Sequence, residues 1–345
     1  NQLVKYGHTV TIVTIFKHEQ FQELDEKIKI INLDFNQGDT WIKRNTIEMI
    51  KILYAFHKYV KKDKPDIIIS FLDSVGLSYL FVNKLFGNSK MIVSERTDPY
   101  SGKKITAPLK KLLVSFADYV VFQTDGSMKF YDKKTQNKSI IIPNPVIISE
   151  DVKNLLQKAI PKFSDRENRI VSVGRMSIKQ KRQDVLIEAF KIVNEKYPDL
   201  TLHFYGDGKD LPQVKKIAQE SNLADKIFFH GHVKNVCQEI FNAKIFVLSS
   251  DYEGIPNALI ESMLLGVPSI STDCRPGGAR ILIKDGVNGI ISPKGDSRIL
   301  SENIIRLLEN NQLADSFTMQ SPKISETFSE ANIAQKWNDV LKLFS

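Results

Sequence analysis

Short apolar runs rich in β-branched residues alternate with longer amphipathic segments along the whole chain. In the first half, runs such as TVTIVTI, DIIISFL, KMIVSER and YVVFQT are separated by segments such as TIEMIKILYAFHKYVKK, whose apolar residues recur at helical spacing. Strands joined by helices of this length form crossover units and a parallel sheet covered on both faces. The first half is therefore predicted to be a Rossmann-like domain.

A second set of strands follows, separated by further helical patterns: RIVSVGR, LTLHFYGDG, IFFHGHV, IFVLSS, PSISTD and NGIISP. The Pro-Asn-Pro turn at 143–145 fits a linker between the two sets. The predicted fold class is α/β, with two Rossmann-like domains that each hold a parallel sheet. The domains are expected over residues 1–148 and 149–325, and residues 326–345 are expected to form a terminal amphipathic helix.

Length and composition add limits. The chain has 345 residues, 42% of them hydrophobic, which suffices for two ordinary cores. No apolar run approaches the roughly 18 residues needed to cross a bilayer. Cys237 and Cys274 match no metal-ligand spacing and favour a reducing, cytoplasmic location. The opening NQLVKYG is typical of the end of a helix, so we expect a preceding strand and loop in a longer protein.

The net charge of +8 is concentrated in the first half, where residues 1–150 hold 22 Lys and Arg against 16 Asp and Glu. Four lysines there border an apolar helix face: Lys103, Lys104, Lys110 and Lys111. Two interpretations stay open, an anionic membrane at the inner face of the cell as a partner, or the solvated face of a packed helix. Nucleic acid is not expected as a partner, because no aromatic-plus-basic motif accompanies the charge.

Ligands of open parallel sheets bind where strands end and helices begin, so candidate chemistry is expected in the strand-end loops of the second half. Arg175 directly follows one strand, and Lys181 stands at the entrance of the next helix. Two cations there suit a diphosphate, because a helix N-terminus adds partial positive charge. The alternative is that both are ordinary surface charges.

The next two strand ends carry glycines and histidines. Gly206 and Gly208 permit close backbone approach, but a third glycine at dinucleotide-fingerprint spacing is absent, so a nicotinamide site is not supported. We interpret His230 and His232 as turn or packing residues, with metal ligation as the alternative. The chain contains no Asp-x-Asp pair, which argues against metal-dependent sugar transfer.

Two glutamates lie in the stretch SSDYEGIPNALIESMLLGVPSIST, residues 249–272. Pro256 suits the first turn of a helix, which places Glu253 in the loop and Glu261 inside the helix. The amides of residues 255–258 would then point at whatever lies beyond the strand end, and phosphate is the group they suit. The two carboxylates can accept hydrogen bonds from sugar hydroxyls.

At this point the residues carry a resemblance. The segment EGIPNALIE, residues 253–261, is similar to the E-x7-E motif of family 4 retaining glycosyltransferases, whose GT-B fold has two Rossmann-like domains facing across a cleft. The resemblance extends in order through IPNPV, VGRMSIKQKRQDVLIEAF, YGDG, FHGHVKN, LLGVPSISTD and GGARILIKDGVNGIISPKGD. It covers nearly the whole second half, whereas the first half matches in its layout.

The resemblance implies transfer of a hexose or N-acetylhexosamine from a nucleotide sugar, with UDP as the expected nucleotide. The acceptor would be a glycan or a lipid-linked sugar in polysaccharide, lipopolysaccharide or capsule synthesis. The donor would bind the second domain and the acceptor the first, and the terminal helix would cross back to the first domain.

The resemblance also implies roles for individual residues. Arg175 and Lys181 would neutralise the diphosphate in place of a metal, so neither a metal nor another cofactor is expected. Glu253 would position the donor sugar, and Glu261 would hold the ribose. The other donor-binding residues implied are Gly174, Gly206, Gly208, His232, Val233, Gly254, Ile255, Pro256, Asn257, Ala258 and Leu259.

The sequence departs from the family pattern in three places. The Gly-rich loop expected near the start is absent, and Ile281 stands where a glutamate is common. The first-domain histidine of many members has no counterpart in SERTDPYSG, where Glu95 and Arg96 are the acceptor-side candidates. Two alternatives of the same fold stay open: a nucleotide-sugar 2-epimerase or phosphorylase, and a non-catalytic sugar-nucleotide binder. The presence of both cations argues against the second.

Overall fold

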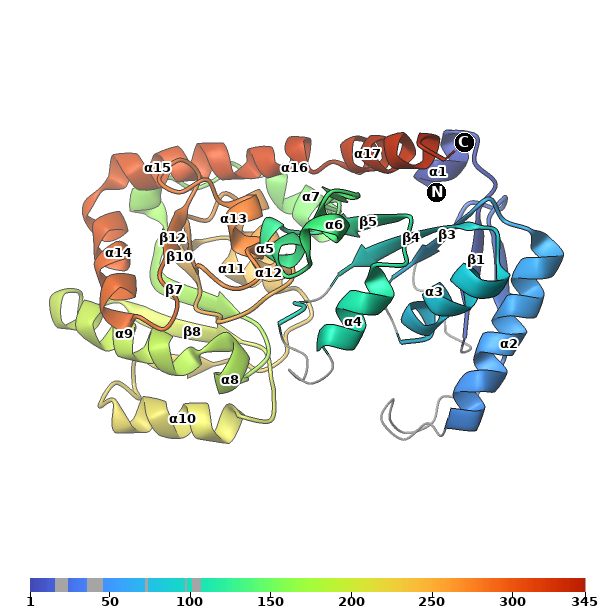
Figure 1. Cartoon of the computed structure of the whole chain (residues 1–345). Helices are drawn as coiled ribbons and strands as arrows, with labels where there is room; N and C mark the ends of the chain where they lie inside the picture. The colour runs from blue at the N-terminus through green and yellow to red at the C-terminus, as the bar shows by residue number, and fades with distance from the viewer. Residues whose placement is uncertain (16–23, 36–45, 72–73, 97, 101–106, 345) are drawn as a thin grey trace. The chain divides into compact units, whose positions relative to one another are not determined.

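The computed structural model describes residues 1–15, 24–35, 46–71, 74–96, 98–100 and 107–344. It divides into two compact units (Figure 1). Unit 1 consists of Asn1–Ile142 together with Glu330–Ser345, and unit 2 consists of Pro143–Ser329. Both units contain parallel sheets with helices packed against them, so the predicted α/β class is confirmed.

Unit 1 contains two parallel sheets, whereas the sequence pattern predicted one domain around one sheet. Strand β1 pairs with β2, and a separate sheet has the order β3-β4-β5-β6. A largely apolar cavity of about 230 Å³ is lined by residues of both sheets and of two neighbouring helices. The strands are β1 Thr11–Thr14, β2 Lys29–Asn32, β3 Ile67–Ser70, β4 Lys90–Glu95, β5 Tyr119–Phe122 and β6 Ser139–Ile141.

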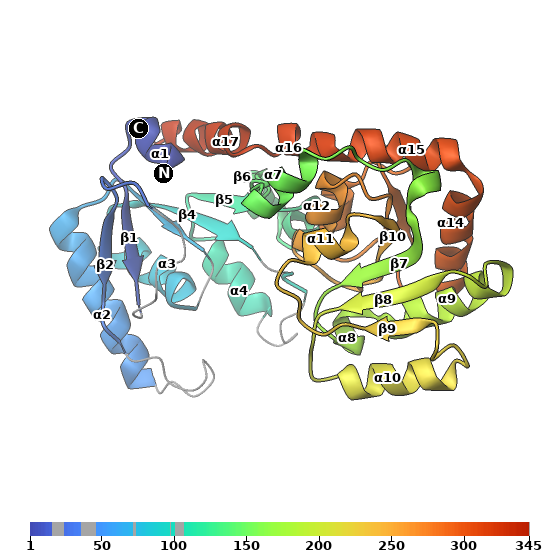
Figure 2. The same ribbon diagram turned by 180° about the vertical axis from the view of Figure 1, so that it is seen from behind.

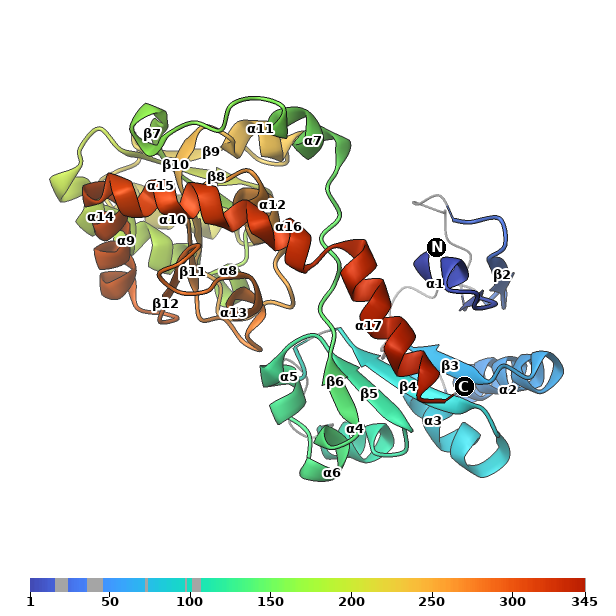
Figure 3. The ribbon, with the colours of Figure 1, turned by 90° about the horizontal axis from the view of Figure 1, so that it is seen from above.

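The helices of unit 1 are α1 Gln2–Lys5, α2 Thr46–Asp63, α3 Ser74–Phe86, α4 Ala107–Val114, α5 Asp125–Lys129, α6 Lys133–Gln136 and α17 Glu330–Lys342. Helices α3 and α4 lie along one face of the four-stranded sheet, and α2 packs beside α3 (Figure 3). Their inner sides bury Tyr79, Met91 and Phe122. The terminal helix α17 contacts α1, and the His8 Nε2 atom lies 2.8 Å from the Asn338 amide oxygen.

Unit 2 is built on one six-stranded parallel sheet in the order β12-β11-β10-β7-β8-β9, whose last three strands lie in sequence in Figure 2. The central strands are buried on both faces, which explains their continuous apolar runs. One face packs against α9 and α14, with Phe190, Phe204 and Ile304 in the core. The strands are β7 Glu167–Val173, β8 Thr201–Tyr205, β9 Ile227–Phe229, β10 Ala243–Leu248, β11 Ser269–Thr272 and β12 Ile290–Ser292.

The helices of unit 2 follow the strands in alternation. None of the helices in the described ranges of the chain is long and apolar enough to span a membrane. The helices are α7 Glu150–Leu156, α8 Ile178–Lys181, α9 Gln183–Lys196, α10 Leu211–Glu220, α11 Val236–Ile240, α12 Asn257–Leu264, α13 Gly278–Leu282, α14 Ser297–Glu309, α15 Asn311–Gln320 and α16 Ile324–Thr327, with short 3-10 helices η3 Phe163–Asp165 and η4 Ser321–Lys323.

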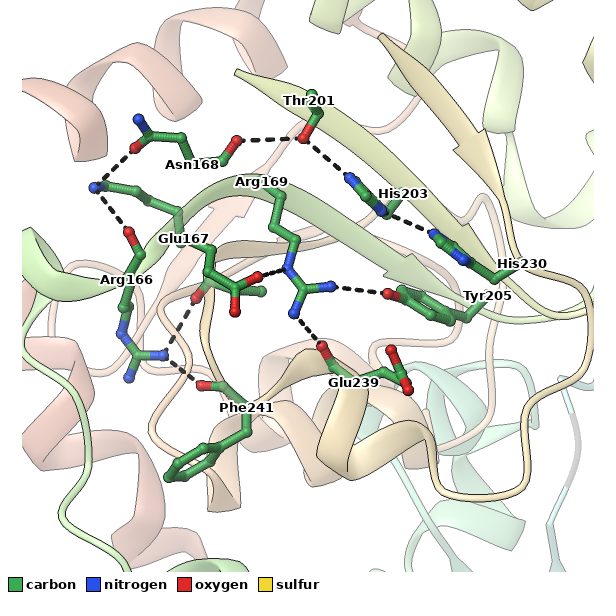
Figure 4. Close-up of polar contacts among 12 residues, drawn as sticks. Arg166, Glu167, Asn168, Arg169, Thr201, His203, Tyr205, His230, Glu239 and Phe241 are labelled. Carbon is green, nitrogen blue, oxygen red and sulfur yellow. Dashed lines mark hydrogen bonds and ion pairs between the residues drawn. The ribbon is translucent and has the colours of Figure 1, made fainter. Parts of the chain in front are cut away.

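A buried arginine ties the start of β7 to its neighbours. Arg166 is 3% exposed, and its guanidinium donates to the carbonyls of Phe241 at 2.8 Å and Ala243 at 3.2 Å (Figure 4). It also donates to the Gly266 carbonyl at 2.7 Å. Burial lowers the pKa of Arg166 to about 10. The three carbonyls lie at or shortly before the starts of β10 and β11, so one side chain fixes the amino-terminal edge of the sheet.

We therefore expect Arg166→Met to lower the free energy of unfolding of unit 2 by about 2–4 kcal/mol, because it leaves three buried carbonyls without a donor. Denaturant unfolding followed by circular dichroism measures this. Arg298→Met is the matched control, since Arg298 pairs with Glu302 on the exposed face of α14. That change should cost under about 0.5 kcal/mol, and equal losses for the two variants would contradict the assignment.

Candidate active site

The order of strands in unit 2 creates a point where the chain reverses direction across the sheet. From β7 the chain adds β8 and β9 on one side, then returns to place β10, β11 and β12 on the other. The loops after β7 and β10 therefore leave the sheet on either side of this switch point, which is where open α/β sheets bind ligands. Arg175 and Lys181 follow β7, and Glu253 follows β10.

Glycines let three strand-end loops touch one another. The Gly174 amide donates to the Tyr205 carbonyl at 2.9 Å, and the Gly206 amide donates to the Gly231 carbonyl at 2.7 Å. A Cβ atom on Gly206 would lie 2.3 Å from the Gly174 oxygen, and one on Gly208 would lie 2.4 Å from the Met176 oxygen. The backbone that approaches these two glycines closely is thus that of the loop after β7.

Lys181 and Glu253 form an ion pair that joins the two loops at the switch point. The Lys181 Nζ atom lies 2.6 Å from the Glu253 Oε1 atom, and both side chains are largely buried. The Ser250 hydroxyl donates to the same carboxylate oxygen at 2.7 Å. A Cβ atom on Gly174 would lie 3.1 Å from the Lys181 Nζ and Cε atoms, so the lysine reaches Glu253 by lying over a glycine.

Polar contacts that sequence reasoning missed brace this pair. Arg182 adopts a left-handed conformation, φ 50°, between α8 and α9, and its guanidinium bridges Asp184 at 3.0 Å and Asp251 at 3.2 Å. The Ser249 hydroxyl donates to the Lys181 carbonyl at 2.7 Å. The sequence predicted that Lys181 stands at the entrance of the next long helix. In the structure it is the last residue of the short helix α8, and α9 begins at Gln183. In the sequence, these contacts were indicated only by the run of polar residues after β10, residues 249–251.

Helix α12 begins one residue later than expected. Pro256 is the N-cap residue, with φ −78° and ψ 110°, and its carbonyl accepts from the amides of Leu259 and Ile260 at 3.1 Å. It thus precedes the first helical turn. Within the described residues, the amides of Gly254, Ile255, Asn257 and Ala258 make no hydrogen bond. These four donors gather at the helix entrance, beside the Lys181–Glu253 pair.

Glu261 occupies the fifth position of α12 and is half-buried. Burial raises the pKa of its carboxyl group. Burial, reinforced by the charge of Glu261, raises the pKa of the Cys237 thiol to about 12. Among the described residues no hydrogen bond or ion pair connects Glu261 with Glu253, so the two carboxylates occupy different surroundings, one paired and one without a cation.

Arg175 is exposed, and its side chain makes no ion pair or hydrogen bond within the described part of the chain. Its backbone is held, because the buried Gln183 side chain donates to the Arg175 carbonyl at 3.0 Å. Gln183 is another residue that sequence reasoning missed. The structure therefore gives the two predicted cations different surroundings: Lys181 is paired and largely buried, and Arg175 is open to solvent.

His230 is a packing residue, as predicted from the sequence. Its ring stacks on Tyr205 with centroids 4.5 Å apart, and its Nε2 atom lies 2.8 Å from the His203 Nδ1 atom (Figure 4). His232 is exposed, and Val233 is half-buried. Across the described ranges, no three His, Cys, Asp or Glu side chains group as metal ligands.

Hydrogen bonds assign the protons of this histidine pair. The Thr201 hydroxyl donates to the Asn168 carbonyl at 3.3 Å, and it lies 3.0 Å from the His203 Nε2 atom, which therefore donates to it. His203 Nδ1 then accepts from His230. Burial, with the charges of His230 and Arg169, lowers the pKa of His203 to about 4, and burial also lowers the pKa of His230.

The acceptor-side candidates lie in unit 1 at the end of β4. Glu95 is fully buried and receives the Lys110 ammonium at 2.5 Å and the Tyr131 hydroxyl at 2.8 Å. Arg96 donates to the Ser94 hydroxyl at 2.7 Å, and burial lowers its pKa to about 10. Glu95 is thus committed to an internal network.

The lysines considered for a membrane surface have varied surroundings. Lys103 and Lys104 lie outside the described residues. Lys110 turns inward to Glu95, and the Lys111 ammonium lies 4.3 Å from the centre of the Phe130 ring. The two described lysines therefore contact unit 1 itself.

Comparison with known proteins decides the family. The model of glycosyl transferases group 1 matches residues 154–323, which include both loops at the switch point. An uncharacterized glycosyltransferase of Methanocaldococcus jannaschii is 31% identical over 281 residues, covering 75% of this chain and 68% of that protein. The chain belongs to the group 1 glycosyltransferases.

Two further proteins resemble this glycosyltransferase over most of its length. An alpha-1,4-N-acetyl-D-galactosaminyltransferase of Campylobacter jejuni, which acts on a saccharide linked to PP-undecaprenol, is 24% identical over 96% of this chain and 89% of its own. The Anabaena protein HepE, crystallised with UDP, has a TM-score of 0.71 at 18% identity, covering 91% of this chain and 86% of that one. With the family, this likeness confirms the expected GT-B fold.

The depressed pKa of His203 predicts a pH dependence of stability for the glycosyltransferase. The unfolded state binds a proton near pH 6.5, whereas folded His203 does so only near pH 4. Its contribution is therefore complete above about pH 6.5 and is lost as the pH falls toward 4. Because the ring is partly exposed, we expect protonation of His203 to lower the free energy of unfolding by about 1 kcal/mol as the pH falls from 7 to 5.

His203→Gln keeps a hydrogen-bonding side chain and removes the titrating ring, so it should flatten this part of the pH profile. Thermal unfolding at half-unit pH steps measures the difference from the unchanged protein. His232→Gln, an exposed histidine on the next loop, is the control. Identical pH profiles for the unchanged protein and His203→Gln would contradict the prediction.

Proposed function

We propose that this glycosyltransferase moves a hexose or N-acetylhexosamine from a UDP-sugar to a glycan or lipid-linked acceptor, with retention at the anomeric carbon. The processes served would be polysaccharide, lipopolysaccharide or capsule synthesis. The observation that carries the donor site is the Lys181–Glu253 ion pair at the switch point of the sheet, next to four amides that have no partner among the described residues.

The geometry fits a nucleotide diphosphate in three respects. Lys181 supplies a cation at the end of α8, and Arg175 supplies a second, exposed one on the loop between β7 and α8. The amides at the entrance of α12 add donors of the kind that bind phosphate. Glu253 lies in the loop between β10 and α12 and faces Lys181. Its carboxylate can accept hydrogen bonds from sugar hydroxyls.

The chemistry follows from where charge develops. The bond between the anomeric carbon and the diphosphate oxygen breaks, leaving negative charge on the diphosphate and positive character on the sugar. Fixed cations and amides aimed at the diphosphate stabilise that charge without reorganising. The acceptor hydroxyl forms the new glycosidic bond and releases its proton, so the products are the glycoside, the nucleoside diphosphate and a proton. Glu253 acts as a positioning group for the sugar.

Glu261 is proposed to bind the ribose. Its place one turn inside α12, with no cation beside it among the described residues, leaves the carboxylate available to accept from hydroxyl groups. Gly174, Gly206 and Gly208 are proposed to shape the donor pocket through the close contact of their loops. His232 and Val233, on the loop after β9, are proposed to contact the nucleotide.

Similar proteins support the choice of substrates. HepE was crystallised with UDP, and the Campylobacter jejuni enzyme acts on a lipid-linked saccharide. We also propose that Arg175 and Lys181 serve in place of a metal, so that a chelator would leave turnover unchanged. A nucleotide-sugar 2-epimerase, a phosphorylase and a non-catalytic binder of the same fold are the alternatives, and the following experiment gives separate results for the epimerase and the binder.

The direct test incubates the protein with a panel of UDP- and GDP-sugars, with and without a membrane lipid extract, in the presence and absence of EDTA. We expect release of UDP only when an acceptor is present. Conversion of the donor sugar without acceptor would support the epimerase. Binding of the nucleotide sugar without turnover would support the non-catalytic binder. Lys181→Met should lower turnover on the order of 100-fold or more, because it removes a cation from the leaving group.

The two glutamates should separate in their effects. Glu261→Ala should weaken binding of free UDP roughly tenfold, because it removes a hydrogen-bonded charged acceptor of the ribose. Glu253→Ala should leave UDP binding within about twofold and lower transfer, because its partner in the donor is the sugar. Isothermal titration with UDP and initial rates of transfer give the two readouts. Equal loss of UDP binding in both variants would contradict the separate roles.

A further inference from the structure

Unit 1 carries a layer of three neighbouring helices whose outer side is unusually apolar. Eight of the 19 large apolar side chains that are exposed in the described residues belong to α2, α3 and α4. These helices follow one another on one side of the unit, and α3 packs against both α2 and α4 (Figures 1 and 3). The concentration is local, because the three helices make up only a small part of the chain.

The exposed apolar residues of α2 form one stripe. Ile47, Ile50 and Tyr54 are spaced three and four positions apart, so they point to the same side of the helix. Lys51 and Lys58 continue the stripe at spacings of four from Ile47 and Tyr54, and both are exposed. The outward side of α2 is therefore both apolar and basic, the composition of helices that lie at a membrane surface.

Helices α3 and α4 extend the same kind of surface. Phe81, Leu85 and Phe86 of α3 are between 49% and 66% exposed, and the Phe86 ring contacts the His57 ring of α2. On α4, Leu109 and Leu112 are exposed, three positions apart. Exposed apolar residues thus occur on all three neighbouring helices, and we call the surface they share the outer face of the α2–α4 layer.

The charge around this face is mainly positive. The three helices carry seven lysines against two acids, Glu48 and Asp63. Asp63 is engaged by Lys29 and by the Tyr59 hydroxyl. Five of the lysines are exposed and form no ion pair within the described ranges: Lys51, Lys58, Lys61, Lys62 and Lys84.

We propose that the outer face of the α2–α4 layer docks on the surface of an anionic lipid bilayer. The apolar side chains enter the boundary between headgroups and acyl chains, and the five lysines contact anionic headgroups. This surface differs from the one expected from the sequence, because Lys110 and Lys111 turn toward unit 1. The proposal rests on the proposed function only for its purpose, which is to bring the enzyme to a lipid-linked acceptor.

The charge decides between possible occupants of this face. A second copy of the chain would bring the same lysines against one another, since the interface of a two-fold dimer contacts itself. A bilayer with anionic lipids offers the opposite sign over a surface of unlimited extent. Docking on lipid should accordingly depend on the anionic fraction and weaken with salt.

The test is co-sedimentation of the full chain with lipid vesicles. One set contains phosphatidylcholine alone, and the other contains phosphatidylcholine with about 30% of the anionic lipid phosphatidylglycerol. We expect binding to the anionic vesicles only, falling as salt rises. Ile50→Ser with Phe86→Ser should weaken it roughly tenfold or more. Lys51→Gln, Lys58→Gln and Lys62→Gln together should weaken it on the order of 100-fold at low salt.

Matched controls change the same kinds of residue on unit 2. Met319→Ser removes an exposed apolar side chain of α15, and Lys191→Gln, Lys215→Gln and Lys323→Gln remove three exposed lysines. These controls should bind vesicles like the unchanged protein. Equal binding to neutral and anionic vesicles, or unchanged binding in the α2–α4 variants, would overturn the proposal.

Two further readouts separate the alternatives. Light scattering should show the same oligomeric state for the unchanged protein and the Ile50→Ser, Phe86→Ser variant, whereas a dimer that this variant breaks would assign the face to a second copy and overturn the proposal. Transfer to a water-soluble acceptor should be equal in the two proteins. Vesicle binding without any transfer would reject the proposed function and leave membrane docking standing.

Discussion

The ion pair between Lys181 and Glu253 is the contact on which the site in unit 2 depends. It joins the segments that follow β7 and β10, through residues 72 positions apart in the chain, at the point where the order of the strands reverses. Bringing two charged groups out of water is costly, and an isolated buried pair contributes little net stability. Its position at the switch point, with Ser250 donating to Glu253 and Arg182 bridging to Asp251, fits the proposed role in donor binding.

Backbone packing makes this pair possible. Lys181 lies over Gly174, Gly206 packs on the Gly174 carbonyl, and Gly208 packs on Met176. A side chain at Gly206 or Gly208 would push one loop away from the next, and a side chain at Gly174 would crowd the end of Lys181. The glycines of the family resemblance thus act here as spacers between loops, and their effect on a ligand is indirect: they set how closely the cation, the carboxylate and the amides of α12 converge.

The sequence predicted the features that local patterns control. Alternating apolar runs gave the α/β class, and the spacing of Glu253, Pro256 and Glu261 placed one carboxylate in a loop and one in a helix. Contacts between distant segments were out of reach. Nothing in the local pattern of α4 shows that Lys110 turns inward to Glu95. In the same way, the local pattern of β8 does not show that His203 shares a hydrogen bond with His230, which follows β9. The separation of β1 and β2 from the other strands of unit 1 is equally a matter of long-range pairing.

The two glutamates show how the same residue type acquires different properties from its surroundings. Glu253 sits beside an ammonium and a hydroxyl, so its charge is balanced before any ligand arrives. Glu261 has no cation beside it among the described residues, and burial raises its pKa. A diphosphate that competes for Lys181 would leave Glu253 without its cation, and the hydroxyls of an attached sugar are the donors that could replace it. With the proposed donor, the pair would therefore link recognition of the phosphate to recognition of the sugar, because the first would free the group that the second requires.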